Sequence, residues 1–137
     1  LGSWINREFE YENYRVKRIA TTTSSGGAPS YQLFTWMNGN LVSSTEHGLT
    51  ITFTYYSDKP GETDYLDYMS FSNELGIKYI RNRNRIKSRD LVSVLEEYSY
   101  LTDDQGRVIS MVYKVGNSST KNRRANIMQV VKVKSIL

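Results

Sequence analysis

The sequence predicts an all-β protein, built as an antiparallel meander of hairpins in a twisted sheet or a partial barrel, with at most one short helix near residues 88–96. A short unit recurs four times in the 137 residues. It consists of two aromatic residues separated by one residue, then a turn, then a β-branched or aliphatic pair. Turn-forming dipeptides such as Asn38-Gly39 separate stretches of alternating polarity. Eleven Tyr against four Phe suit half-buried sheet faces, where the ring packs and the hydroxyl reaches water.

The first two copies of the unit predict two hairpins. The paired aromatics of the four copies are Phe9 and Tyr11, Phe34 and Trp36, Phe53 and Tyr55, and Tyr98 and Tyr100. Residues 7–23 alternate in polarity as a first hairpin, and residues 31–45 form a second. Asn38-Gly39 is typical of a type I′ turn, because both central residues need positive φ. The Ser- and Gly-rich residues 24–30 form a loop that is too short to separate domains.

The third copy starts in the clearest strand, residues 49–56, which places Leu49, Ile51, Phe53 and Tyr55 on one face. A longer loop follows, and the chain is expected to return at Leu66. Residues 65–71 fit a strand covered on both faces. Residues 90–97 fit either a short helix with Ser88 as its N-cap or another strand, and the apolar pattern does not decide between them.

The last copy predicts a hairpin over residues 98–115, with Gly106 at the turn position that needs left-handed geometry. Asp103 and Asp104 suit a turn in which Asp bonds its own backbone. Residues 126–134 close the chain as a β-branched strand. We assign residues 1–137 to one β domain and interpret residues 1–6 as linker residues or a trimmed start, so that a signal or lipid anchor can lie upstream.

Composition excludes several kinds of chemistry. The chain has no Cys, which removes disulfides, thiolate metal sites and Cys nucleophiles. No apolar run approaches the roughly 20 residues that span a membrane, so we expect no transmembrane segment. His47 is the single histidine; we interpret it as a surface turn residue, because no nucleophile motif accompanies it. We therefore expect no catalytic residue, no metal site and no cofactor.

A basic stretch is the sharpest local feature of the sequence. The net charge of +4 depends on six cations between Leu75 and Arg89, where no acid occurs. The candidate ligand-binding residues of this stretch are Arg81, Arg83, Arg85, Lys87 and Arg89. An extended strand would place Arg81, Arg83, Arg85 and Lys87 on one face, where Arg forks suit phosphate or sulfate. A solvated basic surface that prevents aggregation explains the same charges.

Aromatic residues are the second set of candidates, and Trp36, Tyr55, Tyr68 and Tyr79 are those selected for a ligand platform. Exposed rings of this kind can stack on sugars or bases. The alternative is that they form cross-strand pairs that hold the sheet together, which requires no ligand.

A family resemblance rests on these motifs. Residues 98–108, which read YSYLTDDQGRV, resemble one unit of the tyrosine–aspartate (YD, or Rhs-like) repeats. Together with residues 34–42 and 53–56, they look like a domain of unknown function from secreted or surface lipoproteins of gut-dwelling Gram-negative anaerobes. The resemblance covers about residues 9–134. It implies an extracytoplasmic, lipid-anchored β domain, in the periplasm or on the outer cell surface, with no assigned catalytic residue.

Three functions follow, in order of preference. The first is a non-enzymatic extracytoplasmic binding or structural domain, with a glycan held by aromatic side chains or another surface protein as its partner. The second is a polyanion binder, of sulfated glycan or nucleic acid, that uses the basic stretch of residues 78–89; nucleic acid is the partner that we expect less. The third is a hydrolase, which we rank last.

Overall fold

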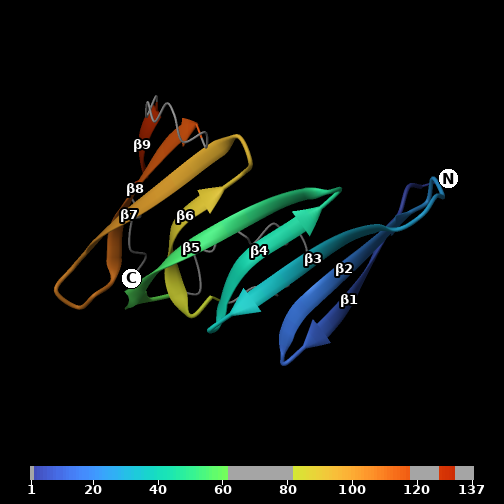
Figure 1. The fold of residues 1–137 in the computed structure, drawn as a ribbon, viewed down its shortest axis with the longest axis horizontal. Coiled ribbons are helices and arrows are strands. Elements are labelled where there is room, and N and C mark those ends of the chain that lie inside the picture. Colours follow the sequence, from blue (N-terminus) through green and yellow to red (C-terminus); the bar gives the residue numbers. More distant parts are fainter. Residues whose placement is uncertain (1, 62–81, 118–126, 132–137) are drawn as a thin grey trace.

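The structure is a computed structural model that describes residues 2–61, 82–117 and 127–131. These residues form nine strands and no helix: β1 (Ile5–Glu12), β2 (Arg15–Thr23), β3 (Ser30–Met37), β4 (Asn40–Glu46), β5 (Leu49–Pro60), β6 (Asn84–Asp90), β7 (Val94–Thr102), β8 (Val108–Asn117) and β9 (Ile127–Val131). They lie in sequence order in one antiparallel sheet. Strand direction turns progressively from β1 to β9 (Figure 1), and the sheet does not close into a barrel. The all-β antiparallel prediction is confirmed.

Several boundaries differ from the predictions. The helix allowed near residues 88–96 is absent, because β6 and β7 occupy that range and join through a tight loop in which Val92 has φ of 73°. The strand alternative for residues 90–97 is therefore correct. Ile5 begins β1 inside the segment interpreted as a linker. The predicted strand at residues 65–71 lies outside the described residues.

Three of the connections are two-residue turns with positive φ at both central positions. They are Asn13-Tyr14 between β1 and β2, Asn38-Gly39 between β3 and β4, and His47-Gly48 between β4 and β5. This geometry defines type I′ turns, whose twist matches that of the flanking strands. The Asn38-Gly39 prediction is confirmed, and His47 lies in a turn as expected.

A bulge in the returning strand of each hairpin explains the recurring sequence unit. In β2, the register moves from Glu10↔Arg18 to Tyr11↔Val16, which leaves Lys17 as the extra residue. Corresponding register shifts occur in the hairpins β3–β4, β5–β6 and β7–β8. A buried aliphatic residue ends each bulge on its turn side: Val16, Leu41, Ile86 and Val108. The aliphatic pair of the sequence unit therefore marks a bulge.

The third hairpin returns later than the sequence suggested. Tyr55 faces Ile86 and Phe53 faces Arg89, so the partner of β5 is β6. The expected return at Leu66 is wrong for this pairing, because the chain reaches β6 only after a long connection. Residues 62–81 of that connection lie outside the described part of the chain.

Ring donors join successive hairpins. The backbone ladders between hairpins are short, with four register pairs between β2 and β3, four between β4 and β5, and three between β6 and β7. Beyond each ladder, a ring of the next hairpin donates a hydrogen bond to the carbonyl of the buried aliphatic residue. The donations are Trp36 Nε1 to Val16 O at 2.8 Å, Tyr55 Oη to Leu41 O at 2.7 Å, and Tyr100 Oη to Ile86 O at 2.8 Å. Each ring thus satisfies a carbonyl that the diverging strands leave without a ladder partner.

An asparagine clasp holds the start of β6 against β4. Asn40 Nδ2 donates to Asn84 Oδ1 at 3.0 Å, and the Asn84 backbone N–H donates to Asn40 Oδ1 at 2.8 Å. Asn82 Oδ1 accepts the backbone N–H of Leu41 at 2.8 Å and lies 3.1 Å from the hydroxyl of Tyr55. These amides fix where the chain re-enters the sheet after its long connection.

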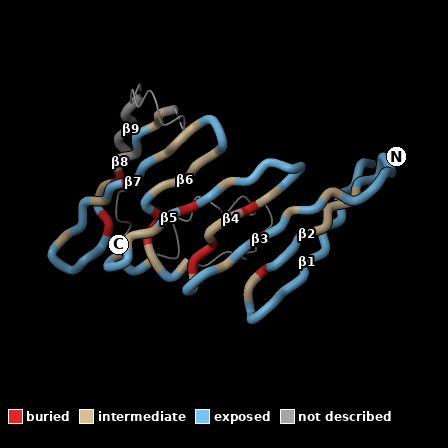
Figure 2. Tube along the Cα trace, in the orientation of Figure 1, coloured by how far each residue is buried: buried red, intermediate tan, exposed pale blue. Residues whose placement is uncertain are grey.

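The core is a row of apolar side chains that runs across the sheet from β2 to β8. Its buried members are Val16, Ile19, Phe34, Leu41, Phe53, Ile86, Tyr98, Val108 and Met111. In Figure 2 the buried positions fall on these central strands, while β1 is almost wholly exposed. The bulges help to build this row, because they place residues three apart, such as Val16 and Ile19, in the core together.

The ring donors predict a specific loss of stability. Tyr55→Phe keeps the packing but removes the donor to Leu41 O, so we expect the free energy of unfolding to fall by about 1–2 kcal/mol. The matched control is Tyr31→Phe, since Tyr31 is 46% exposed; we expect a change within about 0.5 kcal/mol. Urea unfolding of both variants measures the difference, and equal effects would contradict the bridging role of the ring.

Candidate ligand pocket between the first two hairpins

A pocket opens where the first two hairpins diverge beyond their short ladder. Its volume is about 410 Å³. The lining comes from the turn ends of both hairpins and comprises Glu12, Asn13, Arg15, Val16, Lys17, Phe34, Thr35, Trp36, Met37, Asn38 and Gly39. The same divergence that requires a ring donor at Val16 therefore also creates a hollow beside that ring.

Arg15 is the most distinctive residue of the pocket. Its guanidinium carbon lies 5.5 Å from the centre of the Trp36 ring, a cation–π arrangement. Its Nε is buried without a hydrogen-bond partner among the described residues. A buried donor without an acceptor costs free energy. An acceptor group from outside the chain would therefore stabilise this guanidinium.

The same position in a later hairpin makes an internal hydrogen bond through Nη2, although Arg85 Nε, like Arg15 Nε, is buried without one in the described part of the chain. Arg85 precedes the buried Ile86 as Arg15 precedes Val16, and its guanidinium lies 5.9 Å from the centre of the Tyr100 ring. Arg85 Nη2 donates to Gly106 O at 3.0 Å, from the turn of the last hairpin. No corresponding acceptor for Arg15 occurs in the described part of the chain, and the pocket occupies that side of the ring.

A second arginine lies against Gly39, beside the pocket lining. A Cβ on Gly39 would lie 3.0 Å from Cβ of Arg83 and 3.5 Å from Nη2 of Arg15, so both arginines approach this glycine. The backbone N–H of Arg83 donates to Gly39 O at 3.0 Å, which fixes the approach. The Arg83 side chain is exposed.

The charged residues of the pocket lining are Arg15, Lys17 and Glu12, and Arg83 lies beside them. Lys17 Nζ lies 3.1 Å from Glu12 Oε1 and 4.0 Å from Glu10 Oε1, so these acids largely offset its charge. No ion pair holds Arg15 or Arg83 among the described residues. Arg15 and Arg83 therefore carry positive charge that no carboxylate within residues 2–61, 82–117 or 127–131 pairs.

The predicted basic stretch does not form one exposed face. Arg85 and Arg89 are buried, and Arg89 makes a bidentate ion pair with Glu96, with N–O distances of 2.9 Å. Lys87 stands in the bulge of β6 and is exposed, with Nζ 6.0 Å from the centre of the Tyr56 ring. None of the described members of this set lines the pocket, although Arg83 lies against the lining residue Gly39, and Arg81 lies outside the described residues.

The two described residues of the predicted aromatic platform lie at different junctions between hairpins. Trp36 lines the pocket, half-buried, with its indole N–H held by Val16 O. Tyr55 is half-buried at the next inter-hairpin junction, where its hydroxyl bridges Leu41 O and Asn82. Tyr68 and Tyr79 lie outside the described residues.

A second hollow of about 410 Å³ lies near the His47-Gly48 turn, between β3–β5 and the β6–β7 loop. Its walls are mostly apolar and include Leu49, Ile51 and Val92. His47 Nε2 is 3.7 Å from Glu46 Oε1, and both side chains are at least half-exposed. We see no hydroxyl poised on His47 and no group of three possible metal ligands anywhere in the described residues.

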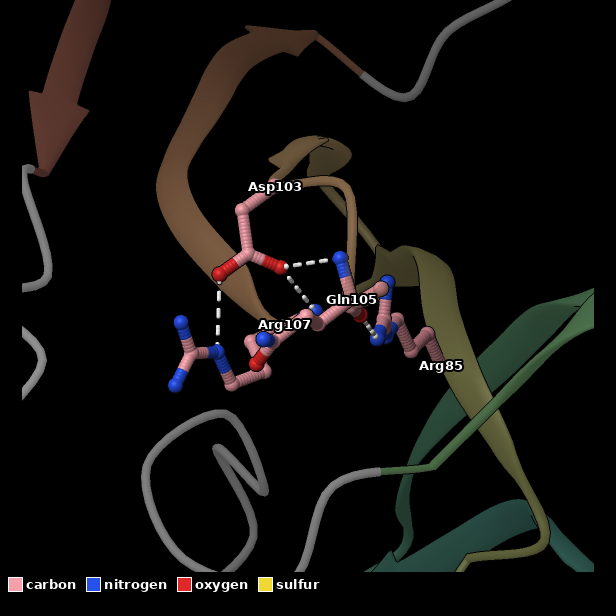
Figure 3. A network of polar contacts seen from close by, with 5 residues as sticks. Arg85, Asp103, Gln105 and Arg107 are labelled. Carbon is pink, nitrogen blue, oxygen red and sulfur yellow. Dashed lines mark hydrogen bonds and ion pairs between the residues drawn. The ribbon is translucent and has the colours of Figure 1, made fainter.

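The carboxylate pair Asp103-Asp104 belongs to a turn. Asp103 Oδ1 accepts the backbone N–H groups of Gln105 at 3.0 Å and Arg107 at 2.9 Å, and Oδ2 accepts Arg107 Nε at 2.7 Å (Figure 3). The Arg107 side chain and backbone are the main reasons why the pKa of Asp103 is lowered. The expectation that this Asp bonds its own backbone is confirmed, and the residue stabilises a loop.

Comparisons with known proteins return no match: no protein-family model, curated protein or solved structure is significantly similar to this chain. The lipoprotein-like and YD-like resemblance stays a prediction. Among the described residues, no helix has the length and apolarity to cross a membrane.

Arg15 is the pocket residue that sequence reasoning missed. The signal was present in the alignment of the repeats, because the residue before the buried aliphatic is Arg15, Asn40, Arg85 and Arg107 in the four hairpins. Arg15 and Arg85 share a role beside the ring of the next hairpin, whereas Arg107 pairs with Asp103 in its own turn. That alignment required the position of β6, which the sequence did not provide.

Gly39 and Gly48 form a matched pair for testing the close approach of Arg83. Both are the second residue of a type I′ turn, with φ of 86° and 77°, so alanine is strained at both. Of these two glycines, only Gly39 has neighbouring atoms within 4 Å of an added Cβ. We therefore expect Gly39→Ala to lower the free energy of unfolding by about 1 kcal/mol more than Gly48→Ala. Equal costs in urea unfolding would contradict the close approach.

The Asp103 turn predicts a pH dependence at the acid end. The lowered pKa means that the stabilisation by Asp103 is complete above the ordinary Asp pKa of about 3.9, and is lost as the pH falls through the folded-state pKa. We expect Asp103→Asn to reduce the acid-induced loss of stability below about pH 4, while Asp104→Asn retains it. NMR titration of the Asp103 carboxyl carbon checks the direction, and an ordinary or raised pKa would contradict it.

Proposed function

We propose that this chain is a non-enzymatic binding domain that holds an anionic glycan in the pocket between its first two hairpins. The observation that carries the proposal is Arg15, which lines a pocket of about 410 Å³ with its guanidinium over Trp36 and has no ion-pair partner among the described residues. The proposal joins the glycan hypothesis to the polyanion hypothesis. The Trp36 ring lies near Arg15 and Arg83, and neither arginine forms an ion pair with a carboxylate of the described residues.

The chemistry of the ligand follows from the groups that line the pocket. An arginine presents a planar fork that suits sulfate or carboxylate oxygens, and Arg15 is part of the pocket lining. Arg83 adds a second cation next to Gly39. The half-buried Trp36 offers apolar ring surface of the kind that packs against a sugar. A sulfated or carboxylated saccharide meets these requirements together.

Competing partners fit this pocket less well. A protein on nucleic acid can neutralise about 6–10 phosphates, whereas the pocket and its rim offer two arginines that no carboxylate in the described residues pairs. A neutral glycan would leave Arg15 without a counter-charge. The extracytoplasmic location and an upstream lipid anchor follow from the resemblance alone, and they accord with a ligand of the cell surface.

The test is calorimetric titration of the full chain with a sulfated heparin tetrasaccharide and with its desulfated counterpart, each at 50 and 500 mM salt. We expect binding of the sulfated sugar that weakens with salt. Arg15→Gln should reduce its affinity at least tenfold, the equivalent of one charge-assisted hydrogen bond.

The matched control is Arg18→Gln. Arg18 also lies over a ring, 5.2 Å from the centre of Tyr31, but it is paired with Glu10 at 2.9 Å and does not line the pocket. Its loss should change the affinity less than twofold. Equal effects of both substitutions, or salt-resistant binding of the desulfated sugar, would overturn the anionic site. Catalytic turnover of the saccharide would overturn the non-enzymatic assignment.

A further inference from the structure

The outer edge of β1 repeats the sequence of a strand that docks on another hairpin. Ile5, Arg7, Phe9 and Tyr11 occupy the positions that Leu49, Ile51, Phe53 and Tyr55 occupy in β5. The registers agree: Tyr11 faces the bulge residue Val16 as Tyr55 faces Ile86. In β5, the side away from its own hairpin partner pairs with β4. In β1, that side has no strand among the described residues.

Tyr11 carries an unused donor. Its counterparts Trp36 and Tyr55 each donate to the bulge carbonyl of the preceding hairpin. Tyr11 has no hydrogen bond from its hydroxyl among the described residues, and it is 56% exposed while stacking on Phe9 at 6.4 Å. The ring is thus prepared for a carbonyl that a further hairpin would present.

We propose that the β1 edge is a docking surface for a β-hairpin of the same type, carried by a partner chain. The returning strand of that hairpin would pair with the Ile5 end of β1. Its bulge carbonyl would accept the Tyr11 hydroxyl, continuing the inter-hairpin interfaces β2–β3 and β4–β5.

A second copy of this chain is a poor partner for two reasons. Pairing of β1 with β1 of another copy would offer Tyr11 no bulge carbonyl, because the bulge of this hairpin lies in β2. The returning strands β2, β4, β6 and β8 already have a neighbour on each side. The partner that we infer is a different chain with a returning strand at its edge.

The test supplies such a hairpin at high effective concentration. A copy of residues 30–48 is fused directly ahead of Ile5, in place of residues 1–4. The copied Leu41 then precedes Tyr11 by 14 residues, the same separation that joins Leu41 to Tyr55. We expect slower hydrogen exchange at the β1 amides that face away from β2. We also expect Tyr11→Phe to lower the Tm of the fused chain by roughly 2–4 °C, while the original chain shifts by less than about 1 °C.

A second measurement keeps the proposal open to refutation if the fusion misfolds. The synthetic peptide of residues 30–48 is titrated into the labelled full chain and followed by NMR. Shifts confined to β1 and abolished by Tyr11→Phe support docking. Unchanged β1 signals up to about 1 mM peptide, the effective concentration of a short tether, would overturn it. Identical Tm shifts from Tyr11→Phe with and without the fused hairpin would overturn it as well.

Discussion

The sheet depends on satisfying the carbonyls that its bulges expose. Successive hairpins share only three or four register pairs and then diverge, so the carbonyls of Val16, Leu41 and Ile86 lie beyond the ladder. In each case a ring from the next hairpin donates to that carbonyl. Because a buried carbonyl without a partner is costly, the ring fixes both the spacing and the angle of neighbouring hairpins. The recurring sequence unit records this requirement: its aromatic supplies a donor, and its aliphatic pair marks an acceptor.

The same requirement explains how the chain tolerates a long connection before β6. Side chains of three asparagines supply hydrogen-bond partners where β6 joins the sheet: Asn40, Asn82 and Asn84. Asn84 follows Asn40 by 44 residues. Tyr55 touches both this clasp and the Leu41 carbonyl. The clasp therefore replaces the local turn that sets the register in the other hairpins. It also holds Arg83 against Gly39, which couples the register of β6 to the composition of the pocket.

Local chemistry made much of the fold predictable from the sequence. Asn38-Gly39, the alternation of residues 49–56 and the aromatic spacing each correctly indicate a strand or turn, because neighbouring residues determine them. The partner of β5 was not predictable, since the clasp acts between distant residues. The basic stretch misled for a related reason: a bulge at Lys87 interrupts the alternation, and Arg85 and Arg89 enter the interior to meet Gly106 and Glu96. Arg15 carried no signal until the repeats could be aligned in register.

The repeat also explains why a ligand pocket occurs at the first junction. Arg15 and Arg85 hold the same repeat position, and each guanidinium lies near the ring of the next hairpin. The long turn of the last hairpin folds back so that Gly106 O accepts Arg85 Nη2. At the first junction, Asn38-Gly39 is a two-residue turn and provides no such acceptor to Arg15. The two junctions therefore differ in the Nη2 contact to a turn carbonyl, and the proposed anion would interact with the arginine whose neighbouring turn is short.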